Sequence, residues 1–203
     1  MTGTREQQKQ ARREAIFRAA ARLFSERGYA ATTVEDIARA AGITVPTFYA
    51  YVPSKADLIV ALYENDRALI DARKQAIIAR PQRDPALAVG ALLLLEIKNG
   101  QDWLGHEVWR DIVATAIRGG GDFQEGLDRL NERVFDAPLA SLLERLVARG
   151  DLRADLDVPA AVALFSDLVM AVFHQELVHD HPWPWVEKRI RRHVKTALAG
   201  MLA

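Results

Sequence analysis

The feature that most constrains the fold of this chain is its helical periodicity. Apolar residues recur three and four positions apart along most of the sequence, and no segment shows convincing alternation of apolar and polar residues, as strands do. Glycine, proline and capping residues then divide the chain into helices. The predicted helices span about residues 5–27, 34–41, 45–52, 54–80, 85–98, 103–118, 123–149 with a kink at Pro138, 158–178 and 184–200. The expected fold class is all-α.

Composition narrows the possible classes of protein. Of 203 residues, 50% are apolar and 27% are charged, which is enough to bury a core and excludes a wholly disordered chain. Cysteine is absent, which excludes disulfides and thiolate chemistry. The start of the chain is polar and does not resemble a signal peptide, and polar residues within the apolar stretch 158–178 make it fall short of a membrane span. We therefore expect a cytoplasmic protein with no membrane partner.

Charge is distributed unevenly along the chain, although the net charge is zero. Residues 1–57 carry nine basic and six acidic side chains, whereas residues 58–203 carry 18 basic and 21 acidic side chains. A basic N-terminal segment favours a polyanionic partner. An ordinary solvated helix face would give the same pattern, so this signal is modest by itself.

Residues 32–58, TTVEDIARAAGITVPTFYAYVPSKADL, have the layout of a helix-turn-helix. Thr33 and Thr44 are placed to cap two short helices, and Gly42 lies in the turn between them. Six apolar residues can form one small core there, namely Val34, Ile37, Ala38, Ile43, Phe48 and Val52.

The second of these short helices has an uncharged outer face. With Phe48 turned inward and about 100° per residue, Val52 falls on the same side as Phe48. The outward residues are Pro46, Thr47, Tyr49 and Ala50, with Val45 and Tyr51 at the margins. Hydroxyls, aromatic rings and small apolar groups of this kind can contact phosphates and thymine methyl groups.

Lys55 lies in the first turn of the next predicted helix, where a cation opposes the helix dipole. A phosphate bound there would reverse the sign of this interaction, because it would meet Lys55, the Ser54 hydroxyl and free backbone N–H groups together. A solvated lysine is the alternative interpretation.

These residues resemble the DNA-binding domain of the TetR/AcrR family of bacterial transcriptional regulators. The resemblance covers residues about 9–62, and the rest of the chain has the length and helical pattern of the family's ligand-binding body. The matching positions are Phe24, Gly28-Tyr29, Thr32-Thr33, Ile37-Ala38, Ala41-Gly42-Ile43, Thr47-Phe48-Tyr49, Tyr51, Ser54-Lys55 and Leu58. The chain departs from the usual pattern with Thr44 in place of Ser, Pro46 in place of Gly and Val52 in place of Phe.

The resemblance implies a domain organisation and a set of DNA contacts. Residues 1–53 would form a three-helix helix-turn-helix domain, and residues 54–203 a helical ligand-binding and dimerisation domain. The implied DNA-binding residues are Thr33, Thr44, Val45, Pro46, Thr47, Tyr49, Ala50, Tyr51 and Lys55. The implied function is that of a sequence-specific repressor released from its operator by a small, mostly apolar effector.

Two C-terminal helices favour assembly into a homodimer. The helix at about 158–178 has apolar residues on all faces, and the helix at about 184–200 carries an apolar stripe. We expect a dimer through these two helices, and hence an operator that is an inverted repeat. The interior of a monomeric bundle is the alternative.

The helix over about 54–80 would join the DNA-binding domain to the body and transmit the effector signal.

Candidate effector-lining residues in the body are Trp103, His106, Trp109, Phe123, Phe165 and His174, for each of which core packing is the simpler explanation.

An enzyme and a protein-binding helical dimer are the competing hypotheses. Catalysis would depend on histidines, yet His106-Glu107 does not continue into the pattern of a zinc protease. His179-Asp180-His181 lacks a third spaced ligand for a metal ion. We therefore expect no catalytic residues, no metal and no cofactor. The hydroxyls and lysine at Thr47, Tyr49 and Lys55 argue against a dimer that binds only protein.

Overall fold

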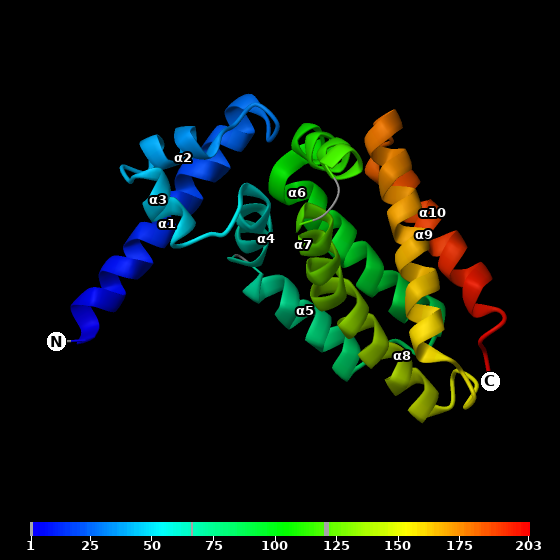
Figure 1. The fold of residues 1–203 in the computed structure, drawn as a ribbon. Helices are drawn as coiled ribbons and strands as arrows, with labels where there is room; N and C mark the ends of the chain where they lie inside the picture. Colours follow the sequence, from blue (N-terminus) through cyan, green and yellow to red (C-terminus); the bar gives the residue numbers. More distant parts are fainter. Residues whose placement is uncertain (1, 66, 120–121) are drawn as a thin grey trace. The chain divides into compact units, whose positions relative to one another are not determined.

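The computed structural model describes residues 2–65, 67–119 and 122–203, and these residues form helices with no strand (Figure 1). The α-helices are α1 (Thr2–Arg27), α2 (Val34–Ala40), α3 (Val45–Tyr49), α4 (Lys55–Asn65), α5 (Ala68–Ala79), α6 (Pro85–Gly119), α7 (Asp122–Asn131), α8 (Ala137–Arg149), α9 (Val158–His179) and α10 (Trp183–Leu198). A short π-helix, η1 (Glu132–Asp136), connects α7 to α8. The all-α fold class expected from the sequence is confirmed.

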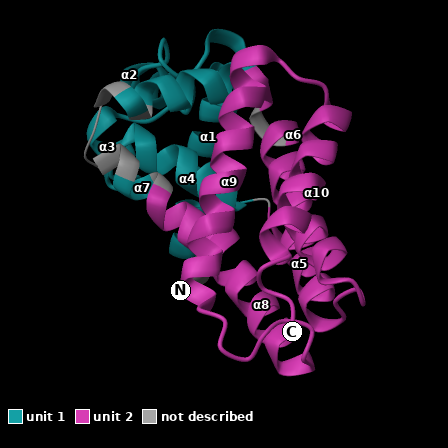
Figure 2. Cartoon of the chain, turned by 90° about the vertical axis from the view of Figure 1, so that its right-hand side faces the viewer, with its two compact units in different colours: residues 1–66, 107–127 teal, residues 67–106, 128–203 magenta. Residues whose placement is uncertain are grey.

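The chain packs as two compact units (Figure 2). The N-terminal unit contains residues 1–66 and 107–127, and the C-terminal unit contains residues 67–106 and 128–203. These units differ from the expected division between residues 53 and 54, because α4 packs with α1 and the second half of α6 also belongs to the N-terminal unit. The functional division of the chain remains a prediction.

The prediction of a single helix over about residues 54–80 is wrong. α4 ends at Asn65 in the N-terminal unit, and α5 begins at Ala68 in the C-terminal unit. Leu69, in the first turn of α5, is 64% exposed. The continuous rod expected to carry the effector signal is therefore absent.

A buried ionic cluster positions α5. Arg67, which caps α5, donates two hydrogen bonds to the Glu96 carboxylate on α6, at 2.8 and 2.9 Å. Lys74, in the middle of α5, contacts the same carboxylate. All three side chains are less than 10% exposed. The start of α5 is thus set by a contact with residues far along the chain.

The interruption expected at Asn99-Gly100 is also wrong, because α6 continues through both residues. Its break lies further on, at Gly105, which has φ +74° and ψ 166°. Only glycine adopts this backbone conformation readily. α6 is therefore two helical segments that meet at Gly105.

Where a kink is expected at Pro138, the structure has a short π-helix, η1, immediately before this proline. Pro138 lies in the first turn of α8 and follows the π-helix η1. Since proline has no N–H to donate, the Val134 carbonyl four residues earlier has no partner within the helix. Lys74 donates a hydrogen bond to this carbonyl. A side chain from α5 thus satisfies the group that Pro138 leaves free.

The core of the C-terminal unit is built from α6, α8, α9 and α10, with α9 and α10 side by side (Figures 1 and 2). Its fully buried residues include Leu93, Leu142, Phe165, Ile190 and Val194. Contrary to the expectation from sequence, the 22-residue α9 is long and apolar enough by composition to span a membrane. One of its sides packs in this core, as in core helices of soluble proteins.

Candidate nucleic-acid interface

The helix-turn-helix at residues 33–50 is held by the caps that the sequence predicts. The Thr33 hydroxyl accepts a hydrogen bond from the Asp36 backbone N–H at 3.1 Å, and the Asp36 carboxylate accepts from the Thr33 backbone at 3.4 Å. This reciprocal pair is a capping box that starts α2. Hydrogen bonds from Thr33 hold the pKa of Asp36 below its usual value.

Thr44 begins α3 in the same way, because its hydroxyl accepts from the Thr47 backbone N–H at 3.3 Å. The hydroxyls of Thr44 and Thr47 also lie 2.8 Å apart. Gly42, with φ +69°, forms the turn between α2 and α3. Local chemistry therefore fixes both helix starts.

A small apolar core lies beneath α2 and α3. Ile37, Ala38, Phe48 and Val52 are buried as expected, whereas Val34 and Ile43 of the predicted core are half-buried. With Phe48 fully buried on one side of α3, the opposite side of this short helix is exposed. The recognition candidates are therefore presented by a rigid element.

Most of the predicted DNA-binding residues lie on α3 or next to it in the chain, whereas Thr33 caps α2 and Lys55 begins α4. Tyr49 is 50% exposed. Thr33, Thr44, Pro46 and Ala50 are exposed, and Val45, Thr47, Tyr51 and Lys55 are half-buried. The face carries hydroxyl, aromatic and small apolar groups and no carboxylate, which suits contact with a phosphate backbone and with base edges.

Lys55 has a structural partner that neither sequence interpretation foresaw. Its ammonium group donates to the backbone carbonyls of Tyr29 at 3.0 Å and of Thr32 at 2.9 Å, and it lies 4.2 Å from the centre of the Tyr29 ring. Burial lowers the pKa of Lys55, an effect that the Asp111 carboxylate opposes. Lys55 thus joins the start of α4 to the loop that precedes α2. An ammonium group has three N–H bonds, so one remains for a phosphate.

The loop between α1 and α2 is fixed from both ends. Buried Thr32 donates from its hydroxyl to the Gly28 carbonyl at 2.8 Å, and burial raises the pKa of Tyr29 to about 12. Gly28 has φ +80°, and a Cβ there would lie 2.6 Å from the Asp111 carboxylate of α6. Asp111 also accepts from the Ala30 backbone N–H at 3.5 Å. The backbone conformation therefore favours glycine at position 28, and a larger residue there would also have to displace the Asp111 carboxylate.

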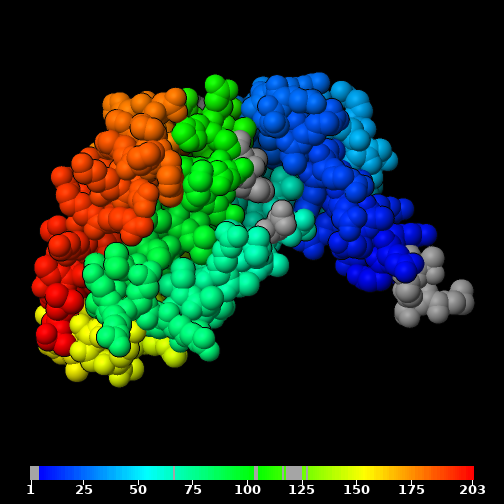
Figure 3. Space-filling view, turned by 180° about the vertical axis from the view of Figure 1, so that it is seen from behind, coloured from blue at the N-terminus to red at the C-terminus, as the bar shows by residue number. Residues whose placement is uncertain are grey.

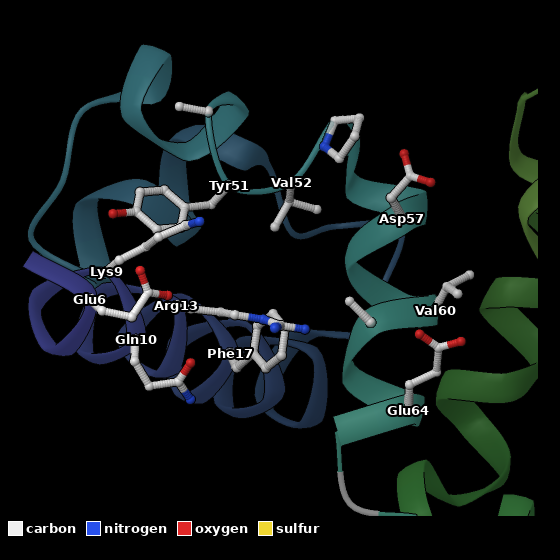
Figure 4. Close-up of a pocket in the computed structure, with 13 residues that line it drawn as sticks. Glu6, Lys9, Gln10, Arg13, Phe17, Tyr51, Val52, Asp57, Val60 and Glu64 are labelled. Carbon is white, nitrogen blue, oxygen red and sulfur yellow. The ribbon is translucent and has the colours of Figure 1, made fainter. Parts of the chain in front are cut away.

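A groove of about 450 Å³ lies beside α3 in the N-terminal unit (Figure 4). One wall comes from α1, with Lys9 and Arg13, and another from α4, with Asp57 and Glu64. Tyr51 closes it next to α3. α1 is on the surface in Figure 3, in blue, and its residues 5–14 are all exposed. The basic side chains of α1 are thus accessible to a polyanion.

The candidate effector-lining residues that the structure describes are divided between the two units. The side chains of Trp103 and Phe123 lie outside the described residues. Trp109 packs edge-on against Tyr63 in the N-terminal unit, with ring centres 6.2 Å apart. Phe165 is fully buried in the C-terminal core, and His174 is exposed on the same helix. His106 contacts Glu176 and Asp180 instead of facing an apolar cavity.

Sequence reasoning missed several charged residues that the structure singles out. Glu96 and Glu176 are buried. Glu96 directly follows the apolar run 91–95, and this position is the signal by which it could have been found, since a charge that is buried with such a run must be paired or bound. Glu176 follows His174 and Gln175 and carries no such signal. Asp111, which contacts Gly28 and Ala30, carries no comparable signal.

Comparison with known proteins agrees with this geometry. A family model described as bacterial regulatory proteins, tetR family, matches residues 16–62, which contain α2, α3 and the start of α4. The chain is 42% identical over 162 residues to the HTH-type transcriptional regulator EthR of Mycolicibacterium smegmatis, covering 78% of this chain and 73% of that protein. It is 32% identical over 168 residues to the probable HTH-type regulator ArpR of Pseudomonas putida, covering 80% and 79%.

Solved structures show the same fold across both units. The structure of Thermus thermophilus FadR, a transcriptional repressor in complex with lauroyl-CoA, matches with a TM-score of 0.73 at 22% identity, covering 94% of this chain and 95% of that chain. The chain has a helix-turn-helix that matches the family model, and its similarity to known regulators extends over most of their length. This chain therefore belongs to the tetR family of bacterial regulatory proteins and is a DNA-binding transcriptional regulator.

Proposed function

We propose that this regulator is a homodimeric repressor that binds an inverted-repeat operator through α3 and is released by a small, mostly apolar effector. The observation that carries the proposal is the uncharged outer face of α3, held in place by the Thr44 cap and the buried Phe48. The relatives are transcriptional regulators, and no catalytic role is proposed. A cytoplasmic location follows from a DNA target.

The proposed contacts divide into positioning and reading. Thr33, Thr47, Tyr49 and Lys55 would bind phosphates through hydroxyl and ammonium groups, which fixes the position of α3 on the duplex. Thr44 lies beside Thr47 and would contribute to the same phosphate site. Val45, Pro46, Ala50 and Tyr51 would face base edges in the major groove, where small apolar groups contact thymine methyls.

The proposed dimer interface is centred on α9. Its side away from the core exposes five apolar residues, Ala163, Leu164, Met170, Ala171 and Val178, interspersed with the polar residues Asp167, His174 and Gln175. The exposed side of α10 carries Lys188, Arg191, Arg192 and Lys195 instead, so α10 would flank the interface. Phe165, Ile190 and Val194 are fully buried in the core of their own chain and are unsuitable probes of this interface.

The proposed effector site lies in the C-terminal unit. The FadR structure from Thermus thermophilus, of the same fold, is a complex with lauroyl-CoA. For this chain the proposal is limited to a mostly apolar small molecule. To release the repressor, this molecule must bind the DNA-bound and free arrangements of the dimer with unequal affinity.

The test of this function is DNA binding by fluorescence anisotropy, with fragments from upstream of the protein's own gene. Tyr49→Phe keeps the ring and removes one exposed hydroxyl. A net hydrogen bond is worth about 0.5–1.5 kcal/mol, so the affinity of a dimer with two such contacts should fall about 5- to 150-fold. Thr196→Val, which removes an exposed hydroxyl on α10, is the matched control and should leave affinity unchanged. Native affinity in Tyr49→Phe, or no fragment that binds specifically, would contradict the proposal.

A further inference from the structure

Three residues far apart in the sequence meet at the end of α9 in the C-terminal unit. His106 comes from α6, and Glu176 and Asp180 lie one helical turn apart at the C-terminus of α9. The His106 Nε2 atom is 2.7 Å from Glu176 Oε1, and the His106 Nδ1 atom is 2.8 Å from Asp180 Oδ1. One donor atom from each residue lies within 4.8 Å of the others. This is the ligand geometry of a small cation site.

The Glu176 carboxylate points to a missing partner. Its side chain is 0% exposed, and neither of its oxygens accepts a hydrogen bond from any residue that the structure describes. A buried, ionised carboxylate without hydrogen bonds is costly unless a cation or metal ion satisfies it. The nearby imidazole lies within contact distance but outside hydrogen-bond geometry. The oxygens of Glu176 therefore remain available as ligands.

The backbone around the cluster is specialised on both sides. His106 directly follows Gly105, the residue at which α6 breaks. Asp180 has φ +54° and is the one non-glycine residue with positive φ in the described parts of the chain. Such conformations cost free energy and concentrate at functional sites. The outer side remains open, because the Asp180 and His106 side chains are 72% and 31% exposed.

We propose that His106, Glu176 and Asp180 form a binding site for a divalent transition-metal ion. One imidazole nitrogen and carboxylate oxygens suit Zn²⁺, Co²⁺ or Ni²⁺, whereas Mg²⁺ and Ca²⁺ prefer oxygen alone. Metal–ligand bonds of about 2.0–2.2 Å separate neighbouring ligand atoms by about 3.0–3.4 Å, so the present contacts need to open by less than about 1 Å. Water would complete the coordination.

The roles of the three side chains follow from their positions. Glu176 and the Nε2 atom of His106 ligate the ion at the buried end. Asp180 accepts from Nδ1–H and holds the ring in place, an arrangement common among metal-binding histidines. Because His106 and Glu176 come from α6 and α9, the ion joins two helices of the C-terminal unit.

The proposal is tested with Zn²⁺ and the full-length protein, by calorimetry and by a competition assay with a chromophoric chelator. The native protein should bind one Zn²⁺ per chain. Glu176→Gln and His106→Gln should each bind at least about 100-fold more weakly, and Asp180→Asn about 10- to 100-fold more weakly. His174→Gln, which alters an exposed histidine of α9 outside the cluster, should bind as the native protein does.

Two further measurements separate loss of the site from loss of the fold. Zn²⁺ should raise the thermal midpoint of the native protein and of His174→Gln but not of Glu176→Gln, whose own helical circular dichroism should match that of the native protein. Co²⁺ should give visible absorption bands that His106→Gln abolishes. The proposal is overturned if the native protein shows no saturable Zn²⁺ binding, or if Glu176→Gln and His106→Gln bind Zn²⁺ as tightly as His174→Gln does.

Discussion

Glu96→Gln should strongly destabilise the protein, because Glu96 is the only carboxylate that the structure shows between two buried cations in the described parts of the C-terminal unit. Its oxygens accept from both terminal nitrogens of Arg67, at 2.8 and 2.9 Å, and contact Lys74. The side chains of Arg67 and Lys74 are 5% and 3% exposed. Glutamine keeps the volume of the side chain and removes its charge. The variant therefore removes the buried anion that the two cations share, and leaves Arg67 with the more exposed Asp71 and Lys74 with the Val134 carbonyl.

The expected loss follows from the cost of breaking a buried ion pair from one side, which is about 3–5 kcal/mol. The free energy of unfolding of natural domains is about 5–15 kcal/mol, so this loss is a large fraction of the total. With a denaturant slope of about 2–3 kcal/mol per molar urea, the midpoint should fall by about 1–2.5 M. No cavity term is needed, since glutamine and glutamate have nearly the same size.

Urea unfolding followed by far-ultraviolet circular dichroism measures this loss. All variants should be compared at one protein concentration, because the proposed dimer would make the measured stability depend on concentration. Glu144→Gln on the exposed side of α8 is the matched control and should change the free energy of unfolding by no more than about 0.5 kcal/mol. A loss below about 1 kcal/mol in Glu96→Gln, or one equal to that of the control, would refute the reasoning.

Three further predictions follow from the same structure. Burial alone would raise the pKa of Glu96, but Arg67 and Lys74 lower it below its usual 4.5. The unfolded chain therefore binds the proton more readily than the folded protein does. In acid unfolding experiments, the stability difference between the native protein and Glu96→Gln should shrink as pH falls below about 4.5. Lys55→Ala should weaken binding to all DNA sequences about equally and lower the slope of log K against log salt by about one unit for each lost phosphate contact, whereas an unchanged slope would leave Lys55 only its carbonyl partners Tyr29 and Thr32. Leu164→Asp, at a position 47% exposed in the single chain, should preserve the fold but reduce the mass measured by light scattering to that of a monomer and weaken operator binding; a variant that remains dimeric would contradict the α9 interface.

The helix-turn-helix could be predicted from sequence because its determinants are local. Thr33 and Asp36 cap each other three residues apart, and Thr44 caps α3 through Thr47. Gly28 and Gly42 both adopt the positive φ expected where a helix ends. Each signal lies within a few residues of the element that it controls.

The helix boundaries and the histidine position that sequence does not predict correctly depend on contacts between distant residues. α5 begins where Arg67 meets Glu96 on α6, a contact that no local pattern specifies. Similarly, Asn99-Gly100 is a stop signal by propensity, but packing carries α6 through it to Gly105. His106 is an effector-lining candidate by sequence, and only the fold brings it to Glu176.

The N-terminal unit is built from two separate stretches of the chain, and this determines when it can finish folding during translation. The helix-turn-helix is encoded within the first 66 residues, but the same unit includes residues 107–127. During translation, α1 to α4 therefore leave the ribosome before Asp111 exists to bind Ala30 and to pack against Gly28. Domains generally fold as units while the chain emerges. The nascent helix-turn-helix reaches its final packing only after the chain has been made as far as Asp111, beyond the first half of α6. A ribosome pause within residues 67–106 would therefore hold it in an incompletely packed state.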